Sequence, residues 1–416
     1  MQTDTIVLGA GIVGISVALH LQKAGRSVLL VDKRAPGEET SYGNAGLIQR
    51  EGVYPYGFPH DFGALIRYAM NNTIDAHYHW SAIPKLAPFL FSYWMHSRAS
   101  HHEAIAHKYA KLIEHCVTEH DALANEAGAA NLLRRNGWMK VFRTAKQQDE
   151  RLAEAARWNR EFGLNYRPLD VATLRKEEPH LDQSLIGGLH WTDPVTVVDP
   201  HGLSKAYVAR FEALGGRTAL GDAGTLAQDG AGGWSVGLAD GTTARARDVV
   251  VALGPWADVL TRRLGYRLPL AVKRGYHMHY KPLGNAVLNH PVLDTERGYF
   301  LAPMLQGVRL TTGAEFADSD APQTPVQLQR AEPIAKTLFP LGERLDPQPW
   351  LGRRPCTPDM MPIIGAAHRH KNLWFSFGHA HHGLTLAAVT GRMIAEMVTG
   401  QKVFVDPAPF SPARFG

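Results

Sequence analysis

The sequence predicts an α/β fold in which a doubly wound nucleotide-binding domain is interleaved with an α+β domain built on an antiparallel sheet. A strand, a glycine turn, a helix and a second strand follow one another over residues 5–31, which is the opening unit of a doubly wound sheet. A strand that runs into a glycine turn recurs at 249–257 and at 373–383, whereas 275–312 holds alternating apolar residues joined by short turns. Pieces of one domain at both ends and in the middle of the chain require the two domains to interleave.

The glycine turn at residues 9–14, with the sequence GAGIVG, is the strongest signal for a bound dinucleotide. Gly9 permits a tight turn, Gly11 allows the backbone to approach a pyrophosphate, and Gly14 lets the helix pack closely on the strand. The N–H groups at the start of the helix then face the phosphates. Asp32 ends the second strand, where its carboxylate can bind ribose hydroxyls and disfavours the 2′-phosphate of NADP. The motif predicts a dinucleotide and leaves FAD and NAD both open.

The remaining elements follow from apolar periodicity and from the Gly and Pro residues that end it. Helices are expected at 15–24, over most of 64–128, and at 147–162, 200–214, 325–338 and 384–398. Strands are expected at 5–8, 28–31, 137–142, 164–166, 234–238, 246–253, 275–280, 298–302, 308–312 and 373–377. We expect residues 1–60, 192–272 and 345–416 to form the nucleotide-binding domain, and 61–191 and 273–344 to form the substrate-binding domain.

Composition and charge exclude several other classes of protein. The 416 residues are 45% hydrophobic and 20% charged, which is ordinary for a globular protein. The formal net charge of +5 comes from scattered residues, so nothing favours nucleic-acid binding. No apolar run approaches the roughly 18 residues of a spanning helix, and the apolar stretch at 6–21 belongs to the nucleotide motif. We therefore expect a cytoplasmic protein, or one on the cytoplasmic face of a membrane.

Cys116 and Cys356 form no CxxC pair, so no zinc site or disulfide framework is expected.

Three further motifs carry possible chemistry. The loop ETSYGNAG at 39–46 is either a plain polar loop or one that lines a diphosphate or a flavin ring. The segment GRRPCTPD at 352–359 places two arginines before a proline-rigid turn, where one of them could clamp a substrate carboxylate. The loop GHAHHG at 378–383 has no zinc-ligand spacing, so we expect no metal there and favour glycine-loop N–H groups that face a flavin carbonyl.

Five motifs span the chain from end to end, in the order GAGIVG, ETSYGNAG, VVVALGPWA, GRRPCTPDMMPIIG and GHAHHGLTLAAVTGRMIAEM. The chain resembles the D-amino-acid dehydrogenase branch of the glycine oxidase, sarcosine oxidase and D-amino-acid oxidase group of flavoproteins. The resemblance implies a Rossmann-like FAD domain in three chain segments and a substrate domain on a large antiparallel-rich sheet. It implies FAD contacts at Gly9, Gly11, Ile12, Val13, Gly14, Asp32, Lys33, Arg34, Thr40, Ser41, Asn44, Ala45, Gly46, Gly254, Gly378, His379, His382, Gly383, Leu384 and Thr385.

The same resemblance implies the substrate residues. Aligned on the proline of a Gly-Leu-Arg-Pro pattern, the arginine that binds the substrate carboxylate is Arg354, and Arg353 replaces an apolar neighbour. A tyrosine that shares the carboxylate is expected at Tyr299, with Tyr276 as the alternative. Sarcosine-oxidase-like relatives attach flavin covalently through a cysteine at the position that Gly352 holds here, so we expect FAD to be bound non-covalently.

The resemblance implies oxidation of a D-amino acid, or of a cyclic amino acid of the D-proline type, by hydride transfer from the α carbon to flavin N5. The electrons would then pass to a quinone or another acceptor. Two alternatives stay open: an oxidase of amines, glycine or sarcosine that uses O₂, and a non-catalytic FAD-binding subunit of a larger complex. The aromatic stretch at 88–95 either packs in the core, which we favour, or makes peripheral contact with a membrane. Which amino acid is oxidised does not follow from the sequence.

Overall fold

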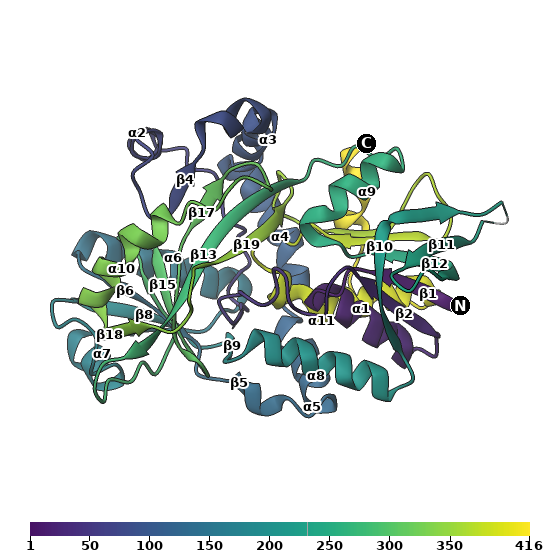
Figure 1. Cartoon of the computed structure of the whole chain (residues 1–416). Coiled ribbons are helices and arrows are strands. Elements are labelled where there is room, and N and C mark those ends of the chain that lie inside the picture. The colour runs from purple at the N-terminus through teal and green to yellow at the C-terminus, as the bar shows by residue number, and fades with distance from the viewer. Residues whose placement is uncertain (231) are drawn as a thin grey trace.

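The computed structural model describes residues 1–230 and 232–416, which form two bodies that lie side by side (Figure 1). The described residues form a sheet of seven strands, here the nucleotide-side sheet, a sheet of eleven strands, here the large sheet, and a small sheet of three. The helices are α1 (Ile12–Lys23), α2 (Phe62–Ala69), α3 (Ile83–His96), α4 (Ala99–Ile113), α5 (Cys116–Glu126), α6 (Ala145–Phe162), α7 (Val171–Glu177), α8 (Pro200–Ala213), α9 (Ala257–Arg263), α10 (Val326–Leu338) and α11 (Gly383–Thr399).

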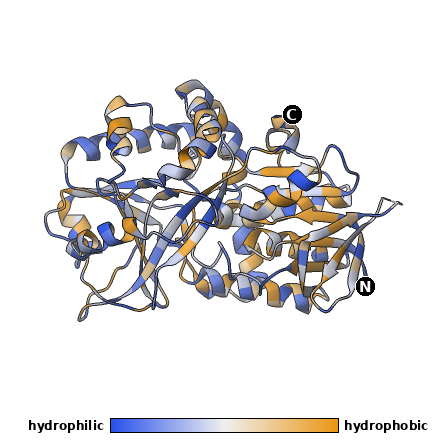
Figure 2. Ribbon diagram, turned by 45° about the horizontal axis from the view of Figure 1, so that its top comes forward, coloured by the Kyte–Doolittle hydropathy of each residue, from blue (hydrophilic) through white to orange (hydrophobic). Residues whose placement is uncertain are grey.

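The nucleotide-side sheet has a parallel centre. Its strands are β1 (Gln2–Leu8), β2 (Val28–Asp32), β10 (Arg217–Gln228), β11 (Trp234–Leu238), β12 (Thr243–Val251), β20 (Ile363–Ala366) and β21 (Leu373–Phe377). Strand β1 pairs in parallel with β2 and with β12, and β12 pairs in parallel with β21. Such strands are buried on both faces and are therefore apolar throughout, as in the Val28–Val31 run. Figure 2 shows the apolar residues concentrated along this sheet and the helices that cover it.

The predicted opening unit is confirmed, since β1, α1 and β2 follow one another around the glycine turn. The predicted strand at 373–377 and the helix that follows it are confirmed as β21 and α11. Helices α1 and α11 pack against each other beside the sheet, so the first and the last predicted glycine turns come together at one end of it (Figure 1).

The large sheet forms the second body and is mostly antiparallel, as the alternating segments predict. Its parallel pairs are β14 with β6 and β17 with β4. Its strands are β4 (Ala76–Tyr78), β6 (Trp138–Phe142), β7 (Tyr166–Leu169), β8 (Gly187–Trp191), β13 (Ala271–Pro282), β14 (Val292–Asp294), β15 (Tyr299–Met304), β16 (Gly307–Thr311), β17 (Ala314–Phe316), β18 (Leu341–Arg344) and β19 (Trp350–Cys356). The small sheet holds β3 (Leu47–Ile48), β5 (Leu133–Arg134) and β9 (Val195–Val197).

The predicted proline-rigid turn at 352–355 is wrong, because these residues lie within strand β19. Strand β19 pairs with β13 along its whole length, from Ala271 with Cys356 to His277 with Trp350. Among the described residues, β13 is the one strand that pairs with β19, so β19 is an edge strand. Pro355 is tolerated there because an edge strand does not need every N–H group for pairing. This strand lies in the large sheet although we assigned its residues to the nucleotide-binding domain, and the remaining domain boundaries stay predictions.

The segment 64–128 is largely helical, as predicted, but β4 interrupts it between α2 and α3. Core packing of the aromatic stretch at 88–95 is confirmed only in part, because Tyr93 belongs to a buried cluster against which Phe89 packs. Within α3 Tyr93 is buried, whereas Phe91 is exposed and the other aromatic residues are half-buried. Among the described residues, no helix combines the length and the apolar character that a membrane span requires.

A candidate cofactor and substrate cavity

A cavity of about 1250 Å³ lies between the nucleotide-side sheet and the large sheet. Its walls run from the glycine turn after β1, past the loop before α11, to the face of the large sheet formed by β13 and β19. Pockets for small molecules usually measure roughly 300–1,000 Å³. The cavity therefore has room for a dinucleotide together with a small substrate.

Two glycines of the first turn are required by the backbone itself. Gly9 has φ +105°, and a Cβ atom there would lie 2.4 Å from the carbonyl oxygen of Ala252. A Cβ atom on Gly14 would lie 1.8 Å from the carbonyl oxygen of Gly9. Gly11 differs, because its nearest neighbour would be the Ser41 hydroxyl at 3.3 Å. The missing side chain of Gly11 therefore keeps the cavity wall open to a ligand.

The polar groups around this turn suit the ADP half of a dinucleotide. One oxygen of Asp32 accepts a hydrogen bond from the N–H of Ala10 at 2.6 Å, and the other accepts from Arg34 N–H at 3.2 Å. The Ser41 hydroxyl accepts from the N–H of Ile12 at 2.8 Å, in the first turn of α1. A helix start offers N–H groups and a partial positive charge to phosphates. Loop 39–46 thus lies over the glycine turn, which supports its interpretation as a diphosphate loop.

Most of the predicted cofactor residues line the cavity. On its wall are Gly9, Gly11, Ile12, Val13, Asp32, Lys33, Arg34, Thr40, Ser41, Asn44, Ala45, Gly254, His379, Gly383 and Leu384. Gly14, Gly46, Gly378, His382 and Thr385 lie behind the wall. The Thr385 hydroxyl donates to the carbonyl oxygen of Leu47 at 3.1 Å, and His382 Nδ1 lies 2.8 Å from the Tyr109 hydroxyl. These five residues hold the loops in place, and direct FAD contacts through the His382 and Thr385 side chains find no support.

The loop before α11 offers polar groups to the cavity. Burial lowers the pKa of His379 to about 3, so its ring is neutral. His379 Nε2 is buried and has no hydrogen-bond partner among the described residues. The first residues of α11, Gly383 and Leu384, line the same region. An unpartnered ring nitrogen beside a helix start fits a ring system with both carbonyl and N–H groups, such as a flavin.

The far end of the cavity holds one of the two adjacent arginines. Neighbouring residues of a strand point to opposite faces of the sheet, and the Arg354 side chain lines the cavity whereas that of Arg353 does not. Arg354 Nη1 donates to the carbonyl oxygen of Gly313 at 2.9 Å, and burial lowers its pKa. Arg353 donates to the carbonyl oxygen of Ser319 at 3.0 Å. A half-buried guanidinium that faces a cavity and has N–H groups without partners among the described residues is suited to a carboxylate.

Both predicted substrate tyrosines line the cavity, but their hydroxyls are engaged within the protein. The Tyr299 hydroxyl donates to Asp294, 3.1 Å away, and Asp294 is paired with Arg143. The Tyr276 hydroxyl accepts from Arg274 at 3.0 Å and donates to Glu315 at 3.1 Å. Neither hydroxyl is free for a substrate carboxylate.

The sequence analysis missed a third tyrosine, Tyr56. Its side chain lines the cavity with 62% of its surface accessible, and its hydroxyl has no hydrogen-bond partner among the described residues. The Tyr56 ring lies 4.4 Å from the ring of His381. Tyr56 and Arg354 line the same cavity. No pattern in the segment YPYGFP distinguishes this tyrosine.

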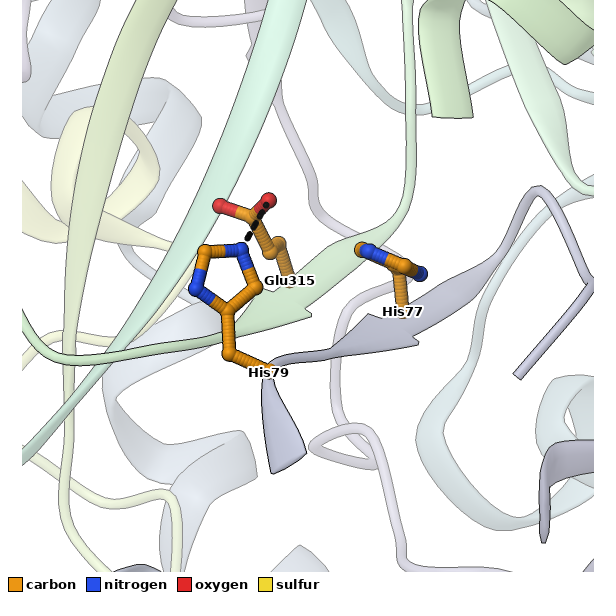
Figure 3. Close-up of side chains that lie close together, drawn as sticks. All are labelled: His77, His79 and Glu315. Atoms are coloured by element: carbon orange, nitrogen blue, oxygen red, sulfur yellow. Dashed lines mark ion pairs between the residues drawn. The ribbon is translucent and has the colours of Figure 1, made fainter. Parts of the chain in front are cut away.

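A cluster of His77, His79 and Glu315 beside the cavity could be mistaken for a metal site (Figure 3). His79 points toward Glu315, with 3.5 Å between Nε2 and Oε1. The Glu315 carboxylate is already paired with Arg274, 2.7 Å away, and accepts from the Thr324 hydroxyl at 2.5 Å. Neutral histidines add no negative charge, so a divalent cation here would stand uncompensated beside Arg274. The cluster therefore acts as a polar network that ties β4 to β17.

Comparison with known proteins supports the interpretation of this cavity as a cofactor site. A family profile described as DAO: FAD dependent oxidoreductase matches residues 4–397. A D-amino-acid oxidase from Bradyrhizobium diazoefficiens is 30% identical over 98% of this chain and 98% of its own. A D-amino acid dehydrogenase from Methylobacterium radiotolerans is 31% identical over 95% of this chain and 96% of its own.

Solved structures share the fold. Glycine oxidase from Geobacillus kaustophilus has a TM-score of 0.74 at 21% identity and covers 99% of both chains. L-proline dehydrogenase from P. horikoshii has a TM-score of 0.75 at 18% identity and covers 100% of this chain and 98% of its own. The resemblance read from the five motifs is confirmed, and with it the flavoprotein fold. The chain belongs to the DAO family of FAD-dependent oxidoreductases.

Proposed function

We propose that the protein is an FAD-dependent dehydrogenase of D-amino acids, including cyclic ones of the D-proline type. The reaction would oxidise the α carbon of the substrate and give an imino acid, with FAD, when bound, as the acceptor of the hydride. If the substrate has a primary amine, the imino acid is then hydrolysed to a 2-oxo acid and ammonia. Relatives named D-amino acid dehydrogenase and D-amino-acid oxidase support this proposal over the whole chain. The observation that carries it is Arg354, a half-buried guanidinium in the cavity that also contains the glycine turn.

The residues of this chain perform binding and orientation. FAD, when bound, supplies the acceptor for the hydride. Arg354 binds the substrate carboxylate and so fixes the α carbon relative to the cofactor loops, and the free hydroxyl of Tyr56 is placed to share that carboxylate. Holding two reactants in a productive geometry supplies much of the rate of such a reaction. Arg354 is only partly exposed to solvent, which strengthens its pairing with the carboxylate relative to a pair in open water.

The test is anaerobic reduction of the bound flavin by a panel of D-amino acids, D-proline derivatives and N-methyl glycines. Bleaching by D-amino acids supports a catalytic dehydrogenase. If no member of the panel bleaches the flavin, the amino-acid proposal fails and the non-catalytic subunit is favoured. Hydrogen peroxide formed in air at the rate of substrate loss would identify an oxidase, whereas dependence on a quinone analogue would identify a dehydrogenase.

We expect FAD to be bound non-covalently, held by the cavity residues around the first glycine turn and the α11 loop. Gly352 carries no side chain that could form a bond to the ring. Acid precipitation of the holoenzyme should release all of its flavin into the supernatant and leave a colourless pellet. Cys356 also lines the cavity, so Cys356→Ala is the matched control and should release flavin in the same way. A yellow wild-type pellet that turns colourless in this variant would instead identify a covalent bond at Cys356.

We also propose that the face around α2 and α3 makes peripheral contact with the cytoplasmic side of a membrane, from which a quinone would accept the electrons. Phe62, Ile66 and Met70 lie one helical turn apart along and just after α2, and all three are exposed, as are Trp80 and Phe91. A cluster of exposed apolar side chains of this kind marks an interaction surface. Helix α2 also lines the cavity through Leu65 and Tyr68, which places this face beside the site.

In the double variant Phe62→Ser with Ile66→Ser, binding to vesicles of anionic phospholipid should fall about ten-fold, because two apolar side chains no longer enter the bilayer. Vesicle co-sedimentation measures this. Leu305→Ser, which removes an exposed apolar side chain on another face, should bind as the wild type does. Equal binding by all three proteins would refute membrane contact through α2.

A further inference from the structure

A second cation, Lys273, lies buried beside Arg354. Lys273 is in β13, where its register partner is Arg354 in β19 on one side and Phe316 in β17 on the other. Side chains directly opposite each other on paired strands lie on the same face of the sheet. Both cations line the cavity, so Phe316, Lys273 and Arg354 form a row across its floor.

Lys273 has no carboxylate partner among the residues that the structure describes. Its Nζ lies 3.9 Å from the ring centroid of Tyr93, 5.5 Å from that of Phe316 and 3.9 Å from Met360 Sδ. The pKa of Lys273 is lowered to about 8, chiefly by burial; the nearby Cys356 opposes this shift and the charge of Arg354 adds to it. A buried charge is costly unless it is paired. Contact with aromatic faces offsets part of that cost but supplies no counter-ion.

The two cations have separate surroundings. The Arg354 guanidinium is held on the side of Thr312 and Gly313, through their carbonyl oxygens. The Lys273 ammonium is held on the other side, over Tyr93 of α3 and toward Met360. One small carboxylate on Arg354 would leave the Lys273 charge unpaired. The floor of the cavity therefore offers two positions for anions.

We propose that the substrate carries a second acidic group, as D-glutamate and D-aspartate do. Its α-carboxylate pairs with Arg354 and its side-chain carboxylate pairs with Lys273. This inference rests on the proposed function and narrows it to acidic amino acids. Two carboxylates neutralise the two cations, and the substrate α carbon keeps the position that Arg354 gives it.

The test compares D-glutamate with D-glutamine, because the two differ only in the charge of the side chain. In anaerobic flavin reduction by the holoenzyme, we expect wild-type kcat/KM to be about 100-fold higher for D-glutamate. Lys273→Met should lower the ratio of the two kcat/KM values about 100-fold, and Lys273→Arg should restore most of it. Lys281→Met, which removes an exposed lysine of the same strand, is the matched control and should keep the wild-type ratio.

A second measurement does not need turnover. Perturbation of the flavin spectrum by succinate and by butyrate gives their dissociation constants. Lys273→Met should weaken the binding of succinate and leave the binding of butyrate unchanged. If Lys273→Met lowers kcat/KM equally for both substrates and weakens the binding of both ligands equally, the proposal is overturned. Lys273 would then bind the same carboxylate as Arg354. A wild type that is reduced by D-glutamine as well as by D-glutamate would also overturn it. Reduction by no D-amino acid at all would instead refute the proposed function.

Discussion

Replacing Arg354 with alanine should lower kcat/KM for flavin reduction by roughly 30- to 4,000-fold, the range for loss of one partner of a buried, hydrogen-bonded charge pair. The half-buried Arg354 guanidinium lines the cavity wall and donates to the carbonyl oxygen of Gly313. In the variant the α-carboxylate would lose its own cation, because the Lys273 ammonium is held on the other side of the cavity floor, over Tyr93. Stopped-flow reduction at several substrate concentrations separates weaker binding from slower hydride transfer.

Arg353→Ala is the matched control, since it removes the same charge one residue away on the opposite face of β19. Its side chain donates to the carbonyl oxygen of Ser319 and stacks at 6.0 Å from Trp256. We expect a change in kcat/KM of less than about three-fold, the small effect typical of a substitution away from the site. If Arg353→Ala is as slow as Arg354→Ala, the assignment of the carboxylate to Arg354 is wrong.

Replacing Gly14 with alanine should abolish retention of FAD and destabilise the apoprotein by more than about 3 kcal/mol, beyond the usual cost of overpacking. The added Cβ atom would lie 1.8 Å from the carbonyl oxygen of Gly9. A backbone atom cannot move aside as a flexible side chain can, so α1 would have to separate from β1. Thermal melting of the apoprotein and the ratio of FAD to protein after gel filtration measure the two effects.

Gly11→Ala separates folding from cofactor binding. Its Cβ atom would meet the Ser41 hydroxyl at 3.3 Å and no backbone atom. The apoprotein should therefore melt within a few degrees of the wild type, a shift equivalent to under about 1 kcal/mol, whereas FAD affinity should fall. A variant with wild-type FAD affinity would show that the cofactor does not approach the backbone at Gly11.

Local signals in the sequence predict the nucleotide-side elements well. The turn at 9–14 and the strand at 373–377 depend on short-range rules, namely glycine where a side chain would collide and apolar runs where a strand is buried on both faces. The collision of a Gly14 side chain with Gly9 and the apolar runs of the strands both lie within a few residues, so they can be recognised without knowing the distant parts of the chain.

What the sequence does not reveal depends on partners far away in the chain. Residues 352–355 resemble a turn because of their Gly and Pro, and become a strand because β13 lies beside them. The Tyr276 and Tyr299 hydroxyls are unavailable because they donate hydrogen bonds to Glu315 and Asp294. Lys273 sits in an ordinary alternating stretch, and its significance appears only when no acid is found near it.

The pairing of β1 with β12 also determines the order in which the protein can fold. Ile6 lies beside Val249, and β12 in turn needs β21, where Val250 lies beside Trp374. On the ribosome, the first strand must wait for more than half of the chain before its second neighbour emerges. Such non-local pairing slows folding and leaves strand edges exposed in the meantime. The glycine turn that is easiest to recognise in the sequence is therefore completed late during synthesis, and chaperones have their greatest opportunity to act on this protein before then.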